Sequence, residues 1–208
     1  SGLLVNYGDI LSQGDPPMGG AVKFHRLATY LPHSPEKFNL IYLGSNSLTK
    51  YWEEILRVAS DKGIPTAYNQ DGVFYPAWYG AGWGARNERM RRWCHRANHV
   101  FYQSRFCREA ADLYLGRREG ASEILYNCVD TNFFTPSEPR EDGQKSVRLL
   151  LTGSQYQRYP VLCALQTLSI LLKGGLDCTL LVAGTLSWAS SVAESHAEFD
   201  NWLDTLSL

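Results

Sequence analysis

The stretch Lys62-Gly63-Ile64-Pro65-Thr66-Ala67-Tyr68-Asn69-Gln70-Asp71-Gly72 decides the fold, because it joins a helix end to a strand and then to a polar turn. The helix before it shows apolar residues at helical spacing, namely Trp52, Ile55, Leu56 and Ala59. Lys62-Gly63 ends that helix, and Ile64 to Tyr68 is predicted to form a strand. A helix, a strand and a polar turn in this order are the repeating unit of α/β folds.

The same alternation extends in both directions along the chain. Further strands are predicted at residues 3–7, 38–43, 100–102 and 124–126. Helices are predicted between them, one with a buried stripe of Met90, Trp93, Cys94 and Ala97, and one with a buried face of Phe106, Ala110, Leu113 and Tyr114. The pattern predicts a doubly wound parallel sheet, a Rossmann-like domain over residues 1–137.

The composition changes between Pro136 and Lys145 to proline, serine, glycine and charged residues, which predicts an interdomain linker at 138–146. The alternation then restarts with strands at 147–151 and 178–182, each followed by a helix. Two strands and two helices are too few for a complete doubly wound domain. We therefore expect residues 147–208 to be the first part of a second Rossmann-like domain.

The composition excludes several classes of protein. The chain has a net charge of -1, whereas a general nucleic-acid binder is strongly basic. No apolar run approaches the roughly 18 residues of a membrane-spanning helix. The five cysteines form no CxxC pair and no cluster with metal-ligand spacing is found, so we expect reduced core cysteines, no metal and a cytoplasmic protein.

Five segments, taken in order, resemble family 4 glycosyltransferases with the GT-B fold. Residues 126–136, Tyr-Asn-Cys-Val-Asp-Thr-Asn-Phe-Phe-Thr-Pro, resemble the hinge between that family's two lobes. Gly19-Gly20 is similar to its first glycine loop, and residues 97–104 to one of its strands. Residues 149–154 and 180–184 are similar to the first two strands of its donor lobe.

The resemblance implies transfer of a sugar from a nucleoside-diphosphate sugar to a hydroxyl of a glycan or lipid-linked acceptor, with retention and without a cofactor or metal. It implies contacts with the donor or its phosphates for Gly19, Gly20, Ser154 and Arg158. Three features depart from the family. Cys128 replaces the hinge glycine, Ser154 stands where the family has arginine, and Arg158 lies one place from its lysine. The family's paired glutamates are not found, so we expect a fragment that lacks the rest of the donor pocket and has little or no activity alone.

Two groups of side chains are candidates for the acceptor site. Asn69, Gln70 and Asp71 follow a predicted strand, and ligands of parallel sheets bind beyond the carboxyl ends of the strands. Asp71 would orient an acceptor hydroxyl or the donor sugar during catalysis, and the alternative is a turn-forming role. Tyr75, Trp78 and Trp83 lie in a glycine-rich loop and offer aromatic faces to a sugar, and the alternative is a lid packed on the core.

Seven arginines between Arg86 and Arg108 concentrate positive charge in a balanced chain. A basic face attracts anionic lipids, so peripheral contact with the inner face of the membrane is one interpretation, and a solvated helix face is the other. A non-catalytic module that binds a glycan or lipid head group remains the second hypothesis for the whole chain. A nicotinamide-dependent dehydrogenase is disfavoured, because no GxGxxG follows the first strand.

Overall fold

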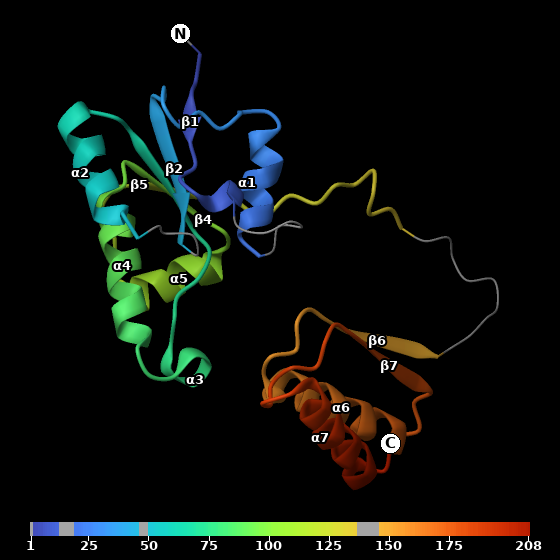
Figure 1. The fold of residues 1–208 in the computed structure, drawn as a ribbon. Coiled ribbons are helices and arrows are strands. Elements are labelled where there is room, and N and C mark those ends of the chain that lie inside the picture. The colour runs from blue at the N-terminus through green and yellow to red at the C-terminus, as the bar shows by residue number, and fades with distance from the viewer. Residues whose placement is uncertain (1, 13–18, 46–49, 137–145) are drawn as a thin grey trace. The chain divides into compact units, whose positions relative to one another are not determined.

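The computed structural model describes residues 2–12, 19–45, 50–136 and 146–208. The chain divides into two compact units, Ser1–Thr135 and Pro136–Leu208 (Figure 1). Apart from Ser146, the predicted linker at 138–146 lies outside the described residues.

A five-stranded parallel sheet forms the centre of the first unit. Its strands are β1 (Val5–Asn6), β2 (Leu40–Gly44), β3 (Thr66–Gln70), β4 (His99–Tyr102) and β5 (Ala121–Ile124). They lie in the sheet in chain order, and Asn69 of β3 pairs with Gly44 on one side and Phe101 on the other. The predicted α/β fold with a Rossmann-like parallel sheet is confirmed.

Helices cover both faces of this sheet (Figure 1). They are η1 (Ile10–Ser12), α1 (Ala21–Ala28), α2 (Trp52–Lys62), α3 (Pro76–Tyr79), α4 (Trp83–Arg96) and α5 (Arg105–Tyr114). The helices α2, α4 and α5 pack on one face, and α1 packs on the other. The short helix α3 was not expected from the sequence.

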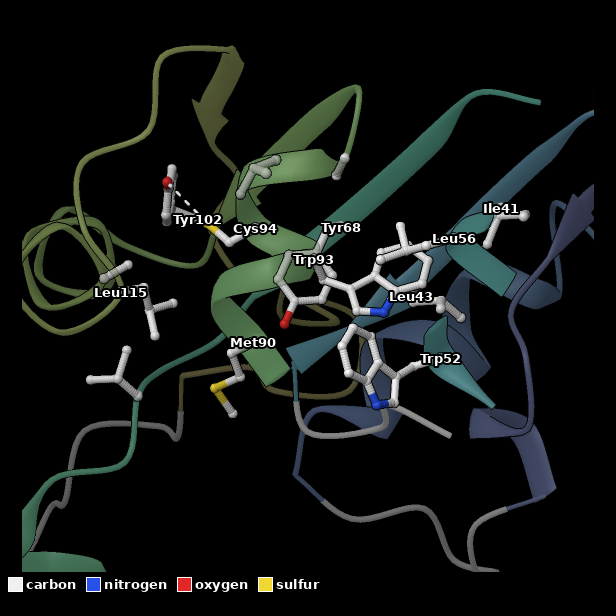
Figure 2. Close-up of a cluster of buried hydrophobic side chains, with 14 of the residues drawn as sticks. Ile41, Leu43, Trp52, Leu56, Tyr68, Met90, Trp93, Cys94, Tyr102 and Leu115 are labelled. Atoms are coloured by element: carbon white, nitrogen blue, oxygen red, sulfur yellow. Dashed lines mark hydrogen bonds between the residues drawn. The ribbon is translucent and has the colours of Figure 1, made fainter. Parts of the chain in front are cut away.

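The larger core lies between the sheet and α2, α4 and α5 (Figure 2). Trp93 of α4 is fully buried and stacks on Tyr68 of β3 with 6.0 Å between ring centroids. Because side chains alternate along a strand, Tyr68 and Gln70 face α4, whereas Ala67 and Asn69 face α1. The predicted α4 stripe of Met90, Trp93, Cys94 and Ala97 is buried in this core.

Several details differ from the sequence predictions. The strand β5 is Ala121–Ile124, so it shares only Ile124 with the strand predicted at 124–126. The strand β3 begins and ends two residues later than predicted, so Asn69 and Gln70 belong to the strand. On α5, Phe106 and Leu113 are exposed, and Ala111 is the buried residue of the helix. Of the cysteines expected in the core, only Cys94 and Cys178 are buried, while Cys128 and Cys163 are exposed.

The second unit pairs two parallel strands with two helices. These are β6 (Val147–Thr152), α6 (Arg158–Lys173), β7 (Cys178–Ala183) and α7 (Val192–Leu206). Val161 and Leu165 of α6 and Leu186 form its buried core. Leu151, Leu180 and Val182 turn toward this core from the sheet, so the sheet has one covered face.

The exits of β6 and β7 approach each other at two glycines. A Cβ on Gly184 would lie 1.9 Å from the carbonyl oxygen of Gly153, and Gly184 has φ +126°. Gly153 also has a positive φ, +107°, but a Cβ there would meet no atom within 4 Å. Only glycine therefore fits at Gly184 without moving the backbone of the neighbouring loop.

We expect Gly184→Ala to destabilise the second unit by about 3 kcal/mol, because it combines backbone strain with overpacking. Gly153→Ala is the matched control, since it carries the strain without the steric contact. Denaturant unfolding followed by the fluorescence of Trp188 and Trp202, which stack in this unit, measures both changes. Equal losses in the two variants would contradict the role given to the close approach.

Candidate functional site

Polar side chains meet at the carboxyl ends of β2 and β3. Ser45 follows β2 and Asp71 follows β3, and the Ser45 hydroxyl accepts a hydrogen bond from the Asp71 N–H at 3.1 Å. The same hydroxyl lies 3.5 Å from Oδ2 of Asp71, and the side-chain amide of Asn69 donates to Oδ1. Both carboxylate oxygens are thus held, which gives Asp71 a defined orientation at the edge where ligands of parallel sheets bind.

Lys23 of α1 extends this polar group toward β5. Its Nζ lies 3.0 Å from Oδ1 of Asn69 and 3.4 Å from the carbonyl oxygen of Leu125, which follows β5. Asn69 therefore connects the ammonium group to the Asp71 carboxylate. We call Lys23, Ser45, Asn69 and Asp71 the edge cluster.

Burial dominates the electrostatics of the edge cluster. It raises the pKa of Asp71 to about 6, although Lys23 and the hydrogen bond from Ser45 act in the opposite direction. Burial also lowers the pKa of Lys23, and the Asp71 charge partly compensates. A carboxylate with a pKa near neutrality that is close to a cation is typical of functional sites.

Gly19 and Gly20 lie immediately before α1, and Gly20 is its N-cap. Gly19 has φ +55°, a conformation that favours glycine, and the N-cap Gly20 has no side chain with which to cap the helix. Lys23, a member of the edge cluster, lies in the first turn of the same helix, so the two glycines precede it by only a few residues. The N–H groups at this helix start and the Lys23 ammonium suit an anionic group of a ligand.

Gln70 does not join the edge cluster, although the sequence grouped it with Asn69 and Asp71. It is fully buried, its side-chain amide donates to the carbonyl of Gly72, and it lies against Met90 of α4. The alternation of side chains along β3 places it on the opposite face from Asn69. Gln70 consequently shapes the turn that carries Asp71, without offering a surface to an acceptor.

The three aromatic candidates lie together beyond this turn. Tyr75 contacts Trp78 and Tyr114 at ring-centroid distances of 5.9 and 6.4 Å, and Trp83 meets Tyr114 edge-on at 5.8 Å. Buried Asn87 of α4 fixes the loop by bonding both the N–H and the carbonyl of Phe74, at 2.9 and 2.7 Å. The loop is thus anchored to α4, while Tyr75 and Trp78 remain exposed.

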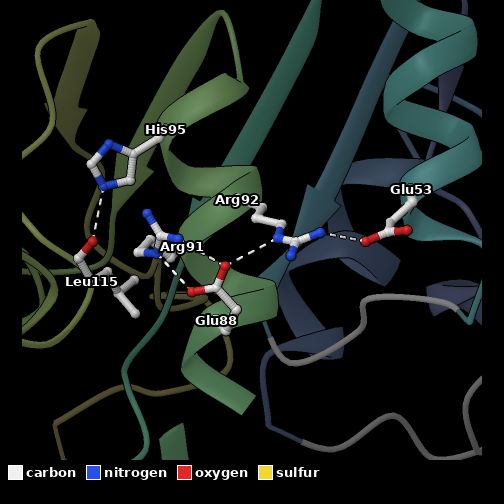
Figure 3. Close-up of polar contacts among 6 residues, drawn as sticks. All are labelled: Glu53, Glu88, Arg91, Arg92, His95 and Leu115. Atoms are coloured by element: carbon white, nitrogen blue, oxygen red, sulfur yellow. Dashed lines mark hydrogen bonds and ion pairs between the residues drawn. The ribbon is translucent and has the colours of Figure 1, made fainter. Parts of the chain in front are cut away.

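Two pairs of arginines on α4 and α5 differ in their contacts. Arg91 and Arg92 both bind Glu88, and Arg92 also reaches Glu53 of α2 at 2.6 Å (Figure 3). These ion pairs join α2 to α4 and give Arg91 and Arg92 acidic partners within the first unit. Arg105 and Arg108 of α5 make no ion pair with any residue that the structure describes.

Ser154 and Arg158 belong to the second unit. Ser154 is exposed in the loop after β6, and Arg158 opens α6. Nε of Arg158 lies 2.7 and 3.0 Å from the two carboxylate oxygens of Glu198 on α7, and Trp188 donates to the same carboxylate at 2.9 Å. The arginine that the sequence analysis assigned to the donor diphosphate is therefore paired with a carboxylate of the protein itself.

If Arg158 contacts the phosphates of a ligand, Glu198→Gln should strengthen binding of a nucleoside diphosphate by about fivefold, because it removes the carboxylate that competes with phosphate for Arg158. Glu194→Gln is the control, as it removes a carboxylate from the same helix without touching Arg158. Calorimetric titration with UDP measures both variants. An unchanged affinity in Glu198→Gln would mean that Arg158 does not contact phosphate.

Three of the contacting residues were not singled out from the sequence. Lys23, Ser45 and Glu198 each act through a partner that is distant in the chain. Ser45 could have been found by the rule that placed Asp71, since it too follows a strand. Nothing in the spacing pointed to Lys23 or Glu198.

Among the described residues, no three His, Cys, Asp or Glu side chains are arranged to hold a metal ion. Within the same residues, no helix combines the length and the apolar character that crossing a bilayer requires.

The fold is similar to that of solved structures. No family model matches the sequence, and no curated protein does. A structure of HepE from Anabaena with UDP and glucose matches 82% of this chain, with a TM-score of 0.55 and 17% identity. A structure of HepE with UDP-glucose matches 90% of it, with a TM-score of 0.56 and 16% identity.

This chain spans 46% and 48% of the length of those two HepE chains. At such low identity the similarity establishes the architecture and no more. The chain has the α/β, Rossmann-like architecture of the GT-B fold.

Proposed function

We propose that this chain is part of a nucleotide-sugar-dependent glycosyltransferase, an enzyme that transfers a sugar to a hydroxyl of a glycan or lipid-linked acceptor, as in polysaccharide synthesis. The observation that carries the proposal is the edge cluster, in which Asn69 joins the half-buried carboxylate of Asp71 to the ammonium group of Lys23 at the carboxyl edge of a parallel sheet. The fold supports it, because HepE shares this architecture and its structures hold UDP and glucose or UDP-glucose.

In this proposal the first unit holds the acceptor and the second begins the donor site. Asp71 orients the acceptor hydroxyl or the donor sugar, and Gly19, Gly20 and Lys23 face the phosphates of the donor. Tyr75, Trp78 and Trp83 would stack on acceptor sugars. Retention follows from the family 4 resemblance, in which the leaving phosphate assists the incoming hydroxyl and the protein positions both partners.

The same proposal requires no cofactor or metal and involves no nucleic acid. It locates the protein in the cytoplasm, at the inner face of the membrane if the acceptor is lipid-linked. Since the chain spans less than half of the matched HepE chains, we expect it to show little or no turnover by itself.

A binding module without catalysis is the second candidate, and the Arg158–Glu198 pair favours it. Glu198 neutralises Arg158, and Ser154 stands where the family has arginine. The second unit therefore offers a diphosphate less positive charge than the family's arginine-lysine pair does. Such a module would bind a glycan or lipid head group through the first unit alone.

A two-dimensional amide NMR titration separates these functions. For a transferase, UDP-glucose should shift the amide signals of Lys23 and Asp71 together with those of Gly153 and Arg158. UDP should shift at least one of these four signals more strongly than GDP or ADP does. For a binding module, oligosaccharides should shift the amide signals of residues near Trp78, and no nucleotide should shift any amide signal. Shifts with oligosaccharides but with none of the nucleotide sugars would favour the binding module over the transferase.

A further inference from the structure

A cavity of about 310 Å³ lies at the amino end of the sheet in the first unit. Its walls come from the end of α2, from the chain that leads into β3, and from the turn between α4 and β4. Thr66 lines the cavity at the start of β3, whereas Asp71 follows the other end of that strand. The cavity is therefore separate from the edge cluster, and its volume falls in the range of sites for small organic molecules.

Hydrogen bonds between Thr66 and Asn98 fix one polar wall of the cavity. Oδ1 of Asn98 accepts from the N–H and from the hydroxyl of buried Thr66, at 2.8 and 3.0 Å. The N–H of Asn98 donates back to that hydroxyl at 3.1 Å. The Asn98 side chain is thus held through its oxygen, while its Nδ2 donors have no partner among the described residues.

Arg96 brings positive charge to the same wall. It is the last residue of α4, and its exposed side chain makes no ion pair or hydrogen bond with the residues that the structure describes. A cation at a helix end often neutralises the last carbonyls, but Arg118 already has this role. Its guanidinium donates to the carbonyl of Cys94 and, at 2.6 Å, to that of Ala97. Arg96 is therefore available to a ligand.

No carboxylate lines the cavity to compete for this arginine. Asp61, the acidic residue at the end of α2, lies 3.4 Å from Arg57 on the same helix. The last carbonyls of α2 are also satisfied, because they accept hydrogen bonds from Gly63 and from the residue that follows it. The wall consequently offers a cation and amide donors, which suit an anion.

The remaining wall is apolar. It is formed by buried Leu56 and Ala59 of α2 together with Ile64 and Pro65, which lead into β3. A simple inorganic anion would leave these side chains in contact with water, whereas an apolar group would cover them. The two kinds of wall together favour a ligand that has an anionic end and an apolar body.

We propose that this cavity binds a small organic anion, a carboxylate or phosphate joined to a compact apolar group. The guanidinium of Arg96 donates paired N–H groups to the oxyanion, and Nδ2 of Asn98 adds a further donor. The apolar group rests on Leu56, Ile64 and Pro65. This site does not depend on the sugar-transfer reaction, because it lies at the opposite end of β3 from Asp71.

Amide NMR titrations of the full chain with benzoate and with phenyl phosphate test the proposal. We expect saturable shifts of the side-chain amide of Asn98 and of the backbone amides of Gly63 and Thr66, and the tighter probe identifies the oxyanion. Benzamide has the shape of benzoate without its charge, and it should bind about tenfold more weakly. Acetate and inorganic phosphate lack the apolar group and should also lose about tenfold.

Substitution of Arg96 separates charge from shape. Arg96→Gln should bind the better anionic probe about tenfold more weakly than the wild type, and benzamide equally well. Arg96→Lys should lose less, because it keeps the charge without the planar fork. Arg105→Gln is the matched control, since it removes an exposed arginine that follows the other end of β4, and it should bind as the wild type does. Circular dichroism should show intact folding in all three.

Several results would overturn the proposal. They are no saturable response to either anionic probe, equal affinity for benzamide and benzoate, or an unchanged affinity in Arg96→Gln. Shifts at Lys23 and Asp71 in place of Asn98 would assign the anion to the edge cluster. Binding of the anionic probes at Asn98 without any response to nucleotide sugars would leave this site standing and count against the transferase, so the two proposals fail separately.

Discussion

Replacing Asp71 with asparagine should stabilise the first unit by about 3 kcal/mol at pH 8. The pKa of Asp71 is raised from 3.8 to about 6, chiefly by burial. At about 1.4 kcal/mol for each pKa unit, the ionised carboxylate opposes folding by this amount. Asparagine keeps an acceptor for the Asn69 amide and removes the buried charge.

The sign of the pH dependence follows from the raised pKa. Between the unfolded value of 3.8 and the folded value of about 6, the folded protein binds more protons, so its stability falls as the pH rises. Asp71→Asn does not lose stability in this way. The excess of its free energy of unfolding over that of the wild type should grow from near zero at pH 4 to its full size above pH 6. Denaturant unfolding at a series of pH values measures this difference.

Asp61→Asn is the matched control, since Asp61 is an exposed carboxylate on α2 that pairs with Arg57. It should change stability little at any pH. An Asp71→Asn advantage that does not vary between pH 4 and pH 8 would contradict the assignment of a buried charge.

Replacing Lys23 with methionine should raise the pKa of Asp71 further, because Lys23 is the cation that lowers it. The change also leaves Oδ1 of Asn69 and the carbonyl of Leu125 without their donor. A carbon NMR titration of the Asp71 carboxyl group reports its pKa directly.

Lys23→Arg separates charge from shape at this position. It retains the positive charge, so the titration of Asp71 should stay nearer to that of the wild type than in Lys23→Met. If both variants titrate as the wild type does, Lys23 has no electrostatic role in the edge cluster. If both shift equally, the shape of the lysine chain matters more than its charge.

Periodicity was sufficient to predict the elements that form the core. Met90, Trp93 and Cys94 recur at helical spacing and are buried on α4, and strands and helices alternate as expected. The position of Asp71 beyond a strand could also be predicted, because parallel sheets place such residues at a common edge. These features depend only on the spacing and order of residues along the chain, which can be read from the sequence.

Features that depend on distant partners could not be predicted. Lys23 reaches Asn69 and Leu125, 46 and 102 residues away, and Arg158 meets Glu198 at a separation of 40. Gln70 seemed equivalent to Asn69 by composition, and only the strand register separates them.

Helix α5 shows a different limit. The apolar side chains of α5 extend around the helix from Phe106 and Leu113 to Ala111. They cover more of its circumference than the part that packs against the sheet. Periodicity identifies such side chains but does not say which of them meet the sheet. Packing in three dimensions selected Ala111 and left Phe106 and Leu113 exposed.

The chain order of the five strands bears on how the protein is made. Each strand of the first unit pairs with the strand that precedes it in the sequence, from β1 to β5. A growing sheet of this kind never has to leave a gap for a strand that has yet to be synthesised. The unit can therefore assemble strand by strand as the nascent chain leaves the ribosome, with each new helix covering the apolar side chains of the last strand before the next one emerges.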